Sequence, residues 1–271
     1  MQIGNREFDV KNHTYVFGIL NATPDSFSDG GKWKGVDGAL KHVETMLAQG
    51  MDVLDVGGES TRPGYQRISS EEEMERVLPV IRAVKERFDV PISLDTYKAD
   101  VAMEGIAAGA DLINDIWGLK ADRRMADVIA NGGAACCLMH NRAEASYHDF
   151  MPDVLKDLEE CLRLAKEAGI PKEKIMVDPG VGFGKTYEQN LDVLARMEDF
   201  KVFGLPVLLG TSRKSVIGLT LDLPADQREE GTLVTTVLAV MKGISFVRVH
   251  DVEKSVRAIK MAEAIRERSI L

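Results

Sequence analysis

Short apolar runs recur along the chain, and each is followed by a polar cluster and then by a segment with helical spacing. Near-continuous apolar strands that alternate with amphipathic helices predict a parallel sheet covered on both faces. Eight such units in about 250 residues are typical of a TIM (β/α)8 barrel. We therefore predict a single α/β barrel domain over residues 1–271, with an open doubly wound sheet as the alternative. The eight runs are YVFGIL (15–20), MDVLDV (51–56), VPISLD (90–95), ADLIND (110–115), AACCLMH (134–140), KIMVDP (174–179), PVLLG (206–210) and SFVRVH (245–250).

The segments between the runs support this alternation. Residues 71–88 and 153–169 carry apolar side chains at spacings of three and four, which predicts helices. After the first run, however, the chain inserts NATPDSFSDGG (21–31) before a helical pattern resumes near Val36. A polar loop of this length at a strand end is more often functional than a simple connector.

Composition narrows the class of protein without changing the predicted fold. The net charge of −9 gives no basic footprint for nucleic acid. The N-terminus has no signal-peptide pattern, and no apolar run is long enough to cross a membrane. Three cysteines, an odd number, indicate reduced thiols rather than a disulfide framework. We therefore expect a cytoplasmic protein that binds neither nucleic acid nor membranes.

Polar or ionisable groups follow all eight runs. In a parallel barrel the carboxyl ends of the strands meet at one rim, so these groups are expected to face one pocket. The groups begin at Asn21, Gly57, Asp95, Asn114, Met139, Asp178, Gly210 and Arg248.

No single motif settles the chemistry. DPGVGFGKT (178–186) does not have the glycine spacing of a nucleotide-phosphate loop or of a dinucleotide fingerprint, so it is either a close-approach loop for a flat ligand or a tight turn. Asp95 could simply cap a helix. His140 and His250 have no third ligand at zinc spacing. Lys214, at a predicted helix start, lies on the unfavourable side of the helix dipole unless an anion or an electron-rich ring is bound nearby.

Taken together, the strand ends describe a site for a flat heterocycle attached to an anion. Asp95, Asp178 and the Asn114 amide suit the adjacent ring N–H and amino donors of a planar heterocycle. Arg248 and His250 are two residues apart on a strand, so they project to the same side and could grip one phosphate.

Five blocks in this order resemble the signature of the dihydropteroate synthase family, over Tyr15 to Val252. They are NATPDSFSDGG (21–31), GGESTRPG (57–64), DPGVGFGK (178–185), GTSRKS (210–215) and RVHD (248–251). The resemblance implies a TIM barrel, usually a homodimer, that is inhibited by sulfonamides. It implies that 6-hydroxymethyl-7,8-dihydropterin diphosphate is joined to p-aminobenzoate, with Mg2+, to give 7,8-dihydropteroate and diphosphate in folate biosynthesis.

The same resemblance implies roles for individual residues. Catalytic roles fall on Lys214, Asp95, Asp29 and Arg248. The pterin ring would be held by Asp95, Asn114, Asp178 and Lys214 in a pocket lined by Ile116, Met139, Phe183 and Gly210. Asn21, Arg248, Val249 and His250 would bind the diphosphate, with Asn21 also at the metal. Phe27, Asp29, Thr61, Arg62 and Pro63 would complete the aminobenzoate site, and Ser215 would receive the aminobenzoate carboxylate. Ser212 would also bind substrate. Trp117 stands where many members have a small residue.

The residues fit this chemistry, and three alternatives remain. Displacing diphosphate from a methylene on an electron-rich ring favours carbocation character, and the neutral arylamine needs no strong base to become a nucleophile. We also expect the loop at 21–31 to close over the diphosphate. The alternatives are a methyltetrahydrofolate methyltransferase barrel, a Schiff-base aldolase that uses Lys214, and a non-catalytic pterin-binding scaffold.

Overall fold

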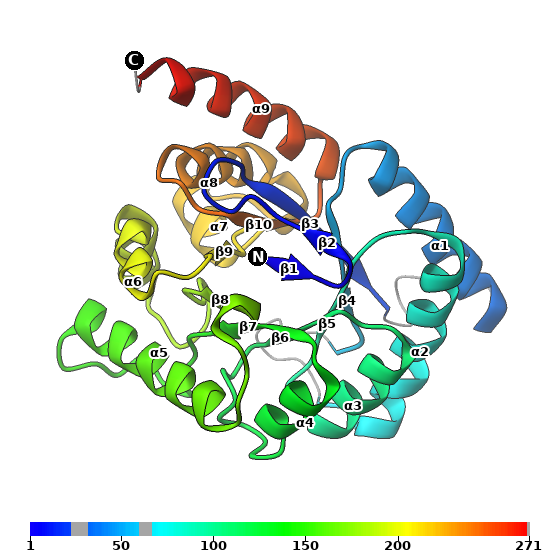
Figure 1. The fold of residues 1–271 in the computed structure, drawn as a ribbon. Coiled ribbons are helices and arrows are strands. Elements are labelled where there is room, and N and C mark those ends of the chain that lie inside the picture. The colour runs from blue at the N-terminus through cyan, green and yellow to red at the C-terminus, as the bar shows by residue number, and fades with distance from the viewer. Residues whose placement is uncertain (23–31, 60–66, 270–271) are drawn as a thin grey trace.

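The computed structural model describes residues 1–22, 32–59 and 67–269. In it, eight parallel strands form a barrel with helices on the outside (Figure 1). The barrel strands are β3 (Tyr15–Asn21), β4 (Val53–Gly57), β5 (Ile92–Asp95), β6 (Leu112–Asp115), β7 (Ala135–Met139), β8 (Ile175–Asp178), β9 (Leu208–Leu209) and β10 (Phe246–Val249). All eight predicted strands are therefore confirmed.

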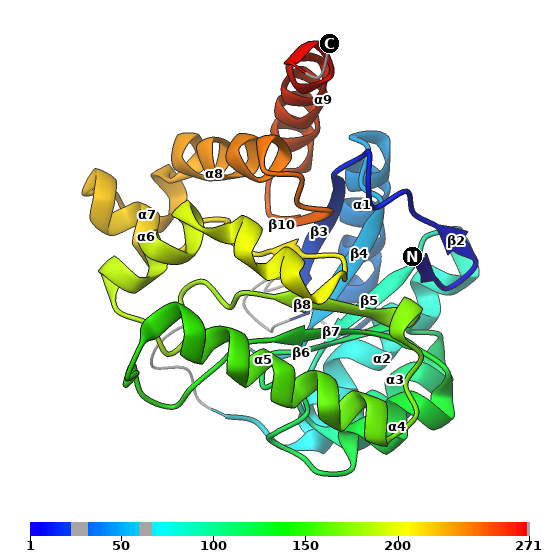
Figure 2. The same ribbon diagram turned by 60° about the vertical axis from the view of Figure 1, so that its left-hand side comes forward.

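The helices occupy the segments between these strands, as the periodicity predicts. They are α1 (Lys32–Ala48), α2 (Ser70–Arg87), α3 (Ala99–Ala108), α4 (Met125–Gly132), α5 (Phe150–Glu167), α6 (Tyr187–Ala195), α7 (Ser215–Leu221), α8 (Glu229–Met241) and α9 (Val252–Ser269). Within the described residues, 3-10 helices also lie at Lys172–Lys174, Met197–Phe203 and Ala225–Gln227. Figure 2 shows α5 lying along the outside of the sheet beside β7.

The sheet is closed, which rejects the open alternative. Its hydrogen-bonded order runs β8-β7-β6-β5-β4-β3-β10-β9. Val177 on β8 also bridges in parallel to Val207, directly before β9, and the Val177 N–H donates to the Pro206 carbonyl at 3.0 Å. The first and last strands of the order therefore meet, and the prediction of one TIM barrel is confirmed.

Alternation along the strands separates two apolar clusters. The larger cluster lies between the sheet and the helices and includes Leu54, Ile113 and Val247. The smaller one fills the barrel interior near the amino ends of the strands and includes Phe17 and Phe246. Because successive side chains on a strand point to opposite faces, this pattern identifies the inward-facing positions along every strand.

A short N-terminal hairpin covers the amino end of the barrel, a feature that the sequence analysis did not predict. Strands β1 (Gln2–Ile3) and β2 (Arg6–Glu7) pair antiparallel and lie across the barrel opening in Figure 1. Ile3 and Phe8 join the interior apolar cluster, and the rings of Phe8 and Phe246 are 5.7 Å apart. This end is therefore sealed by apolar packing.

Candidate active site

The carboxyl ends of the strands place polar side chains inside the barrel. Asp95 ends β5 and is paired in register with Asn114 on β6, while Asp178 ends β8 opposite Met139 on β7. Asp95, Asn114 and Asp178 are 9%, 1% and 3% exposed. They occupy the same inward-facing parity as the interior apolar cluster, so the predicted convergence of Asp95, Asn114 and Asp178 is confirmed.

Arg248 on β10 links two buried carboxylates across the barrel. Its Nη2 donates to Asp95 Oδ2 at 2.5 Å, and its Nε lies 2.6 Å from Asp55 Oδ2. The second contact is an ion pair whose angles fall outside hydrogen-bond geometry. Ser93 donates its hydroxyl to the other oxygen of Asp55 at 2.6 Å. Burial works against the charge on Arg248, but Asp55 and Asp95 outweigh it and keep the pKa of Arg248 above its ordinary value.

The two carboxylates expected at the heterocycle have raised pKa values. Burial raises the pKa of Asp95 to about 6, against the opposing effect of Arg248. Burial also raises the pKa of Asp178, against a hydrogen bond from the Gly180 N–H and the charges of Arg248 and Lys214. Both carboxylates therefore sense the same two cations, which is the electrostatic signature of a shared site.

Asn114 has an unsatisfied acceptor in this interior. Its Oδ1 is buried and has no hydrogen-bond partner among the described residues. A buried polar atom without a partner costs about 1–3 kcal/mol, so a ligand donor at this point would recover free energy. A Cβ added to Gly210 would lie 3.6 Å from Asp178 Oδ2, so Gly210 leaves room beside that carboxylate for a flat ring.

Lys214 approaches the same interior from the start of α7. Its backbone is extended at the N-cap position, as predicted for a helix start. The preceding Arg213 has a left-handed φ of 59°. Two hydrogen bonds hold that strained residue, one from its N–H to Thr232 Oγ1 and one from Arg228 to its carbonyl.

The Lys214 side chain lies against the glycine-rich loop. Its Nζ is 4.1 Å from the centre of the Phe183 ring, which is a cation–π geometry. Burial, reinforced by the positive charge of Arg248, lowers the pKa of Lys214 to about 8. We call Asp55, Asp95, Asn114, Asp178, Lys214 and Arg248 the interior cluster.

Arg248 and His250 have different described partners, although the sequence predicted a joint anion clamp. The Arg248 guanidinium pairs with interior carboxylates, whereas His250 Nδ1 is 2.9 Å from Ser212 Oγ. The physical reason is that Arg248 lies deeper in the barrel than His250. At that depth its guanidinium is beside two buried carboxylates, Asp55 and Asp95, and neutralises their charge. The side chain of Val249 packs in the cluster between sheet and helices, and its predicted role as a ligand residue stays a prediction.

The remaining predicted residues lie at the rim or outside the described part. Ile116 and Met139 are buried at the ends of β6 and β7, at 3% exposure each, and Phe183 is half-buried. Asn21 is exposed at the end of β3, and Ser215 is exposed as the first residue of α7. Phe27, Asp29, Thr61, Arg62 and Pro63, and with them the expected loop closure over 21–31, lie outside the described residues.

Two interior residues escaped the sequence analysis. Asp55 interrupts the apolar run MDVLDV at an inward position and is 1% exposed. Ser93 does the same in VPISLD. A signal in the sequence could have identified both residues: each is polar and lies two positions before the end of its strand, so its side chain points to the same inward side as the last residue.

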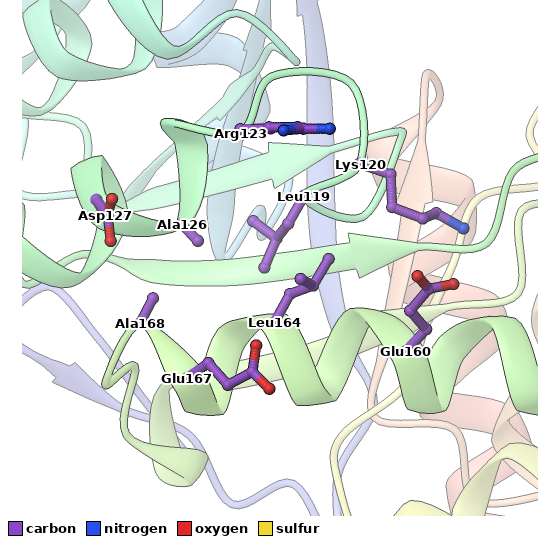
Figure 3. Close-up of a pocket in the computed structure, with 9 residues that line it drawn as sticks. All are labelled: Leu119, Lys120, Arg123, Ala126, Asp127, Glu160, Leu164, Glu167 and Ala168. Carbon is purple, nitrogen blue, oxygen red and sulfur yellow. The ribbon is translucent and has the colours of Figure 1, made fainter.

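A separate groove lies outside the barrel, between α4 and α5 (Figure 3). It has a volume of about 620 Å3, with Leu119 and Leu164 at its floor and Lys120 and Glu160 at its edge. None of the predicted site residues that the structure describes lines it. It has neither the converging carboxylates nor the unsatisfied amide of the interior cluster, so we place the candidate site in the barrel.

Comparison with known proteins identifies the family to which the chain belongs. The pattern of the family described as pterin binding enzyme matches residues 17–250. The dihydropteroate synthase of Clostridium beijerinckii is 57% identical over 99% of this chain and 100% of its own length. That of Bacillus subtilis is 52% identical over 94% of this chain and 90% of its own.

Solved structures agree in fold. A dihydropteroate synthase from Clostridium difficile, crystallised in the presence of pteroic acid, has a TM-score of 0.93 at 49% identity, covering 96% of this chain and 99% of the other. The Yersinia pestis enzyme with a sulfonamide drug has a TM-score of 0.91 at 41% identity, covering 99% of both chains. These relatives favour the synthase over the methyltransferase, aldolase and scaffold alternatives. The chain belongs to the pterin-binding enzymes and, within them, to the dihydropteroate synthases.

Proposed function

We propose that the interior cluster binds the pterin ring of 6-hydroxymethyl-7,8-dihydropterin diphosphate and that the chain joins this substrate to p-aminobenzoate. As a dihydropteroate synthase the chain is a transferase: a bond forms between the arylamine nitrogen and the pterin methylene carbon, and the bond from that carbon to diphosphate breaks. The single observation that carries the proposal is the buried set of Asp95, Asn114 and Asp178, in which Asn114 Oδ1 has no hydrogen-bond partner within the described part of the chain.

The chemistry of the ring matches this set of donors and acceptors. Carboxylates at Asp95 and Asp178 accept hydrogen bonds from ring N–H and amino groups, and Asn114 Oδ1 accepts one more. Lys214 donates to the electron-rich side of the ring. Arg248 favours the ionised form of Asp95, in which this carboxylate acts as an acceptor.

The leaving diphosphate is assigned to the rim above the ring. Asn21 and His250 lie there at the ends of β3 and β10, and the positive charge of Arg248 lies deeper in the barrel. Fixed positive groups stabilise negative charge as it develops on a leaving group. The aminobenzoate carboxylate would lie near Ser215 at the start of α7. Its other predicted contacts, Phe27, Thr61, Arg62 and Pro63, stay predictions.

Mg2+ fits this arrangement as an ion held mainly by substrate and water. No group of three His, Cys, Asp or Glu side chains in the described part could hold a metal by itself. The Asn21 amide offers a hard oxygen at the rim, and Mg2+ commonly takes one or two protein ligands together with substrate phosphates. When bound, it would neutralise charge on the diphosphate.

We also propose a homodimer in the cytoplasm. Leu219 and Leu221 on α7 and Val234, Val237 and Met241 on α8 are exposed apolar side chains, between 37% and 67% exposed, and a second copy would cover them. Cys136, Cys137 and Cys161 are free and buried, as expected in a reducing compartment. Every helix within the described ranges is too short or too polar to span a bilayer.

The direct test is diphosphate release by the purified protein. Release is expected only when the pterin diphosphate, p-aminobenzoate and Mg2+ are all present, with dihydropteroate formed in equal amount. Asn114→Leu is expected to weaken pterin binding strongly, whereas the matched control Asn12→Leu, at the other end of the barrel, should not. Release that is independent of p-aminobenzoate would overturn the proposal.

A further inference from the structure

The loop at 179–186, between β8 and α6, carries residues that face the candidate site. Phe183 lies beneath the Lys214 ammonium, and a Cβ on Gly182 would lie 3.3 Å from Lys214 Cδ. Gly180, Gly182 and Gly184 all have positive φ angles. The position of Lys214 therefore depends on how this loop is held.

The outer side of the loop is packed against the segment that follows β7. A Cβ on Gly180 would come within 1.9 Å of the His140 carbonyl oxygen, and one on Gly184 within 2.4 Å of the Arg142 carbonyl oxygen. Tyr147 donates its hydroxyl to the Gly184 carbonyl at 2.6 Å. Asn190 Oδ1 accepts from the Gly182 N–H at 2.6 Å. The loop thus has fixed contacts along its length.

Lys185 joins the two sides of this packing. Its Nζ is 2.9 Å from the Gly180 carbonyl, 3.1 Å from the Phe183 carbonyl and 2.7 Å from His140 Nδ1. His140 Nε2 is 3.1 Å from Asp157 Oδ2, and Arg142 Nε donates to the same oxygen at 2.6 Å. A carboxylate at Asp157 requires the proton on His140 Nε2, so Nδ1 is an acceptor. All three N–H groups of a charged Lys185 then have acceptors.

We propose that Lys185 is a positioning residue for pterin binding, because its ammonium group fixes the loop that places Phe183 against Lys214. The inference rests on the proposed pterin site. Burial lowers the pKa of Lys185 to about 7, against the opposing charges of Asp178 and Asp157. A cation kept at such a position carries an energetic cost, and its three acceptors offset that cost.

The first test compares two lysines that each bridge separate segments of the chain, at opposite ends of the barrel. Lys185→Met removes the three-way contact. Lys85→Met is the matched control, because Lys85 pairs with Asp111 at 2.5 Å at the amino end of the barrel. Calorimetry with 6-hydroxymethylpterin is expected to show at least tenfold weaker binding for Lys185→Met and less than twofold change for Lys85→Met. The KM for p-aminobenzoate should change less than twofold in both.

A second pair of variants tests the same contact without removing Lys185. An Asn side chain places its oxygen near the position of His Nδ1, whereas Gln reaches the position of Nε2. His140→Gln therefore loses the acceptor for Lys185, and His140→Asn retains one. Pterin binding is expected to weaken about fivefold more in His140→Gln than in His140→Asn.

The outcomes separate this inference from the proposed function. If the unmodified protein binds pterin and Lys185→Met binds it equally well, the positioning role is wrong and the proposed function stands. Equal losses for pterin and p-aminobenzoate would show a general structural effect and would also overturn it. If Lys185→Met does not fold, the His140 pair decides, and equal binding by its two members overturns the inference. If the unmodified protein binds no pterin, both proposals fail.

Discussion

The two ends of this barrel use the same strands for opposite purposes. At the amino end, Phe8, Phe17 and Phe246 pack with the N-terminal hairpin in an apolar interior. At the carboxyl end of the same strands, only a few residues farther along, the interior holds Asp95, Asp178 and Arg248. The strands therefore change from apolar to ionisable within about one side-chain layer.

This difference separates stability from chemistry. Burying apolar rings stabilises the fold by roughly 1.5–3 kcal/mol for each large side chain. Burying ion pairs gives little net stability, because desolvation offsets their attraction. The carboxyl end instead retains groups with shifted pKa values, such as Lys214 and Asp95, which are useful for binding a polar ring.

The largest expected effect is on activity at the carboxyl end. Lys214→Ala should reduce kcat/KM by about a thousandfold, since removing one preorganised charged donor typically costs a hundred- to a thousandfold. The circular dichroism spectrum and unfolding midpoint should stay near those of the unmodified protein. Turnover within tenfold of normal would contradict the role of Lys214.

The next effect is on stability at the amino end. Phe246→Ala should lower the free energy of unfolding by about 3–5 kcal/mol, because it leaves a cavity among Phe8, Tyr15 and Phe17. Urea unfolding measures the loss. The KM values of the folded variant should change less than twofold, and a tenfold change in the pterin KM would remove the separation between the two ends.

A smaller effect concerns pH and the loop contact. Burial lowers the pKa of His140 to about 4 from 6.5, so the unfolded chain binds more protons between these values. Stability should therefore fall as the pH falls from 6.5 to 4, by up to roughly 3 kcal/mol at about 1.4 kcal/mol per pH unit. His140→Gln should lack this part of the slope, and the exposed control His148→Gln should keep it. Equal slopes in all three proteins would show that His140 is not buried in its neutral form.

The smallest effect leaves both ends unchanged and concerns the second substrate. A sulfonamide should raise the apparent KM for p-aminobenzoate without lowering kcat, because the drug resembles that substrate. Initial rates at several concentrations of both measure this. Inhibition that lowers kcat and leaves that KM unchanged would contradict a shared aminobenzoate site.

Much of the fold follows from the sequence because strand and helix periods are local signals. Each of the eight runs became a barrel strand, although PVLLG gave only Leu208–Leu209. Helix α2 runs over Ser70–Arg87, one residue earlier at each end than the predicted 71–88, and Ser69 caps it by accepting from the Glu72 N–H. The count of eight units favoured a closed barrel, but periodicity alone could not establish closure, because closure depends on the Val177–Val207 bridge between distant segments.

The positions of polar side chains could be predicted where these residues lie at strand ends. Which side chains pair with one another could not be predicted as well, because pairing depends on contacts between distant strands. The strand-end positions of Asp95, Asn114 and Asp178 correctly predicted that these side chains lie together inside the barrel, and Lys214 lies at a helix start, as predicted; their roles in binding stay predictions. The pairing of Arg248 with Asp55 was not predicted, because a spacing of two on one strand says nothing about contacts with β4, which is separated from β10 by β3. The hairpin over the amino end was missed for a similar reason, since Ile3 and Phe8 are buried only by packing against residues distant in sequence, such as Phe246.

The most direct test of the division between the two ends is a crystal structure of the protein with a bound pterin. The account predicts the ring inside the carboxyl end, with its N–H and amino groups within hydrogen-bond distance of Asn114 Oδ1 and the Asp178 carboxylate. A ring bound in the groove between α4 and α5, with Asn114 Oδ1 still lacking a partner, would contradict it.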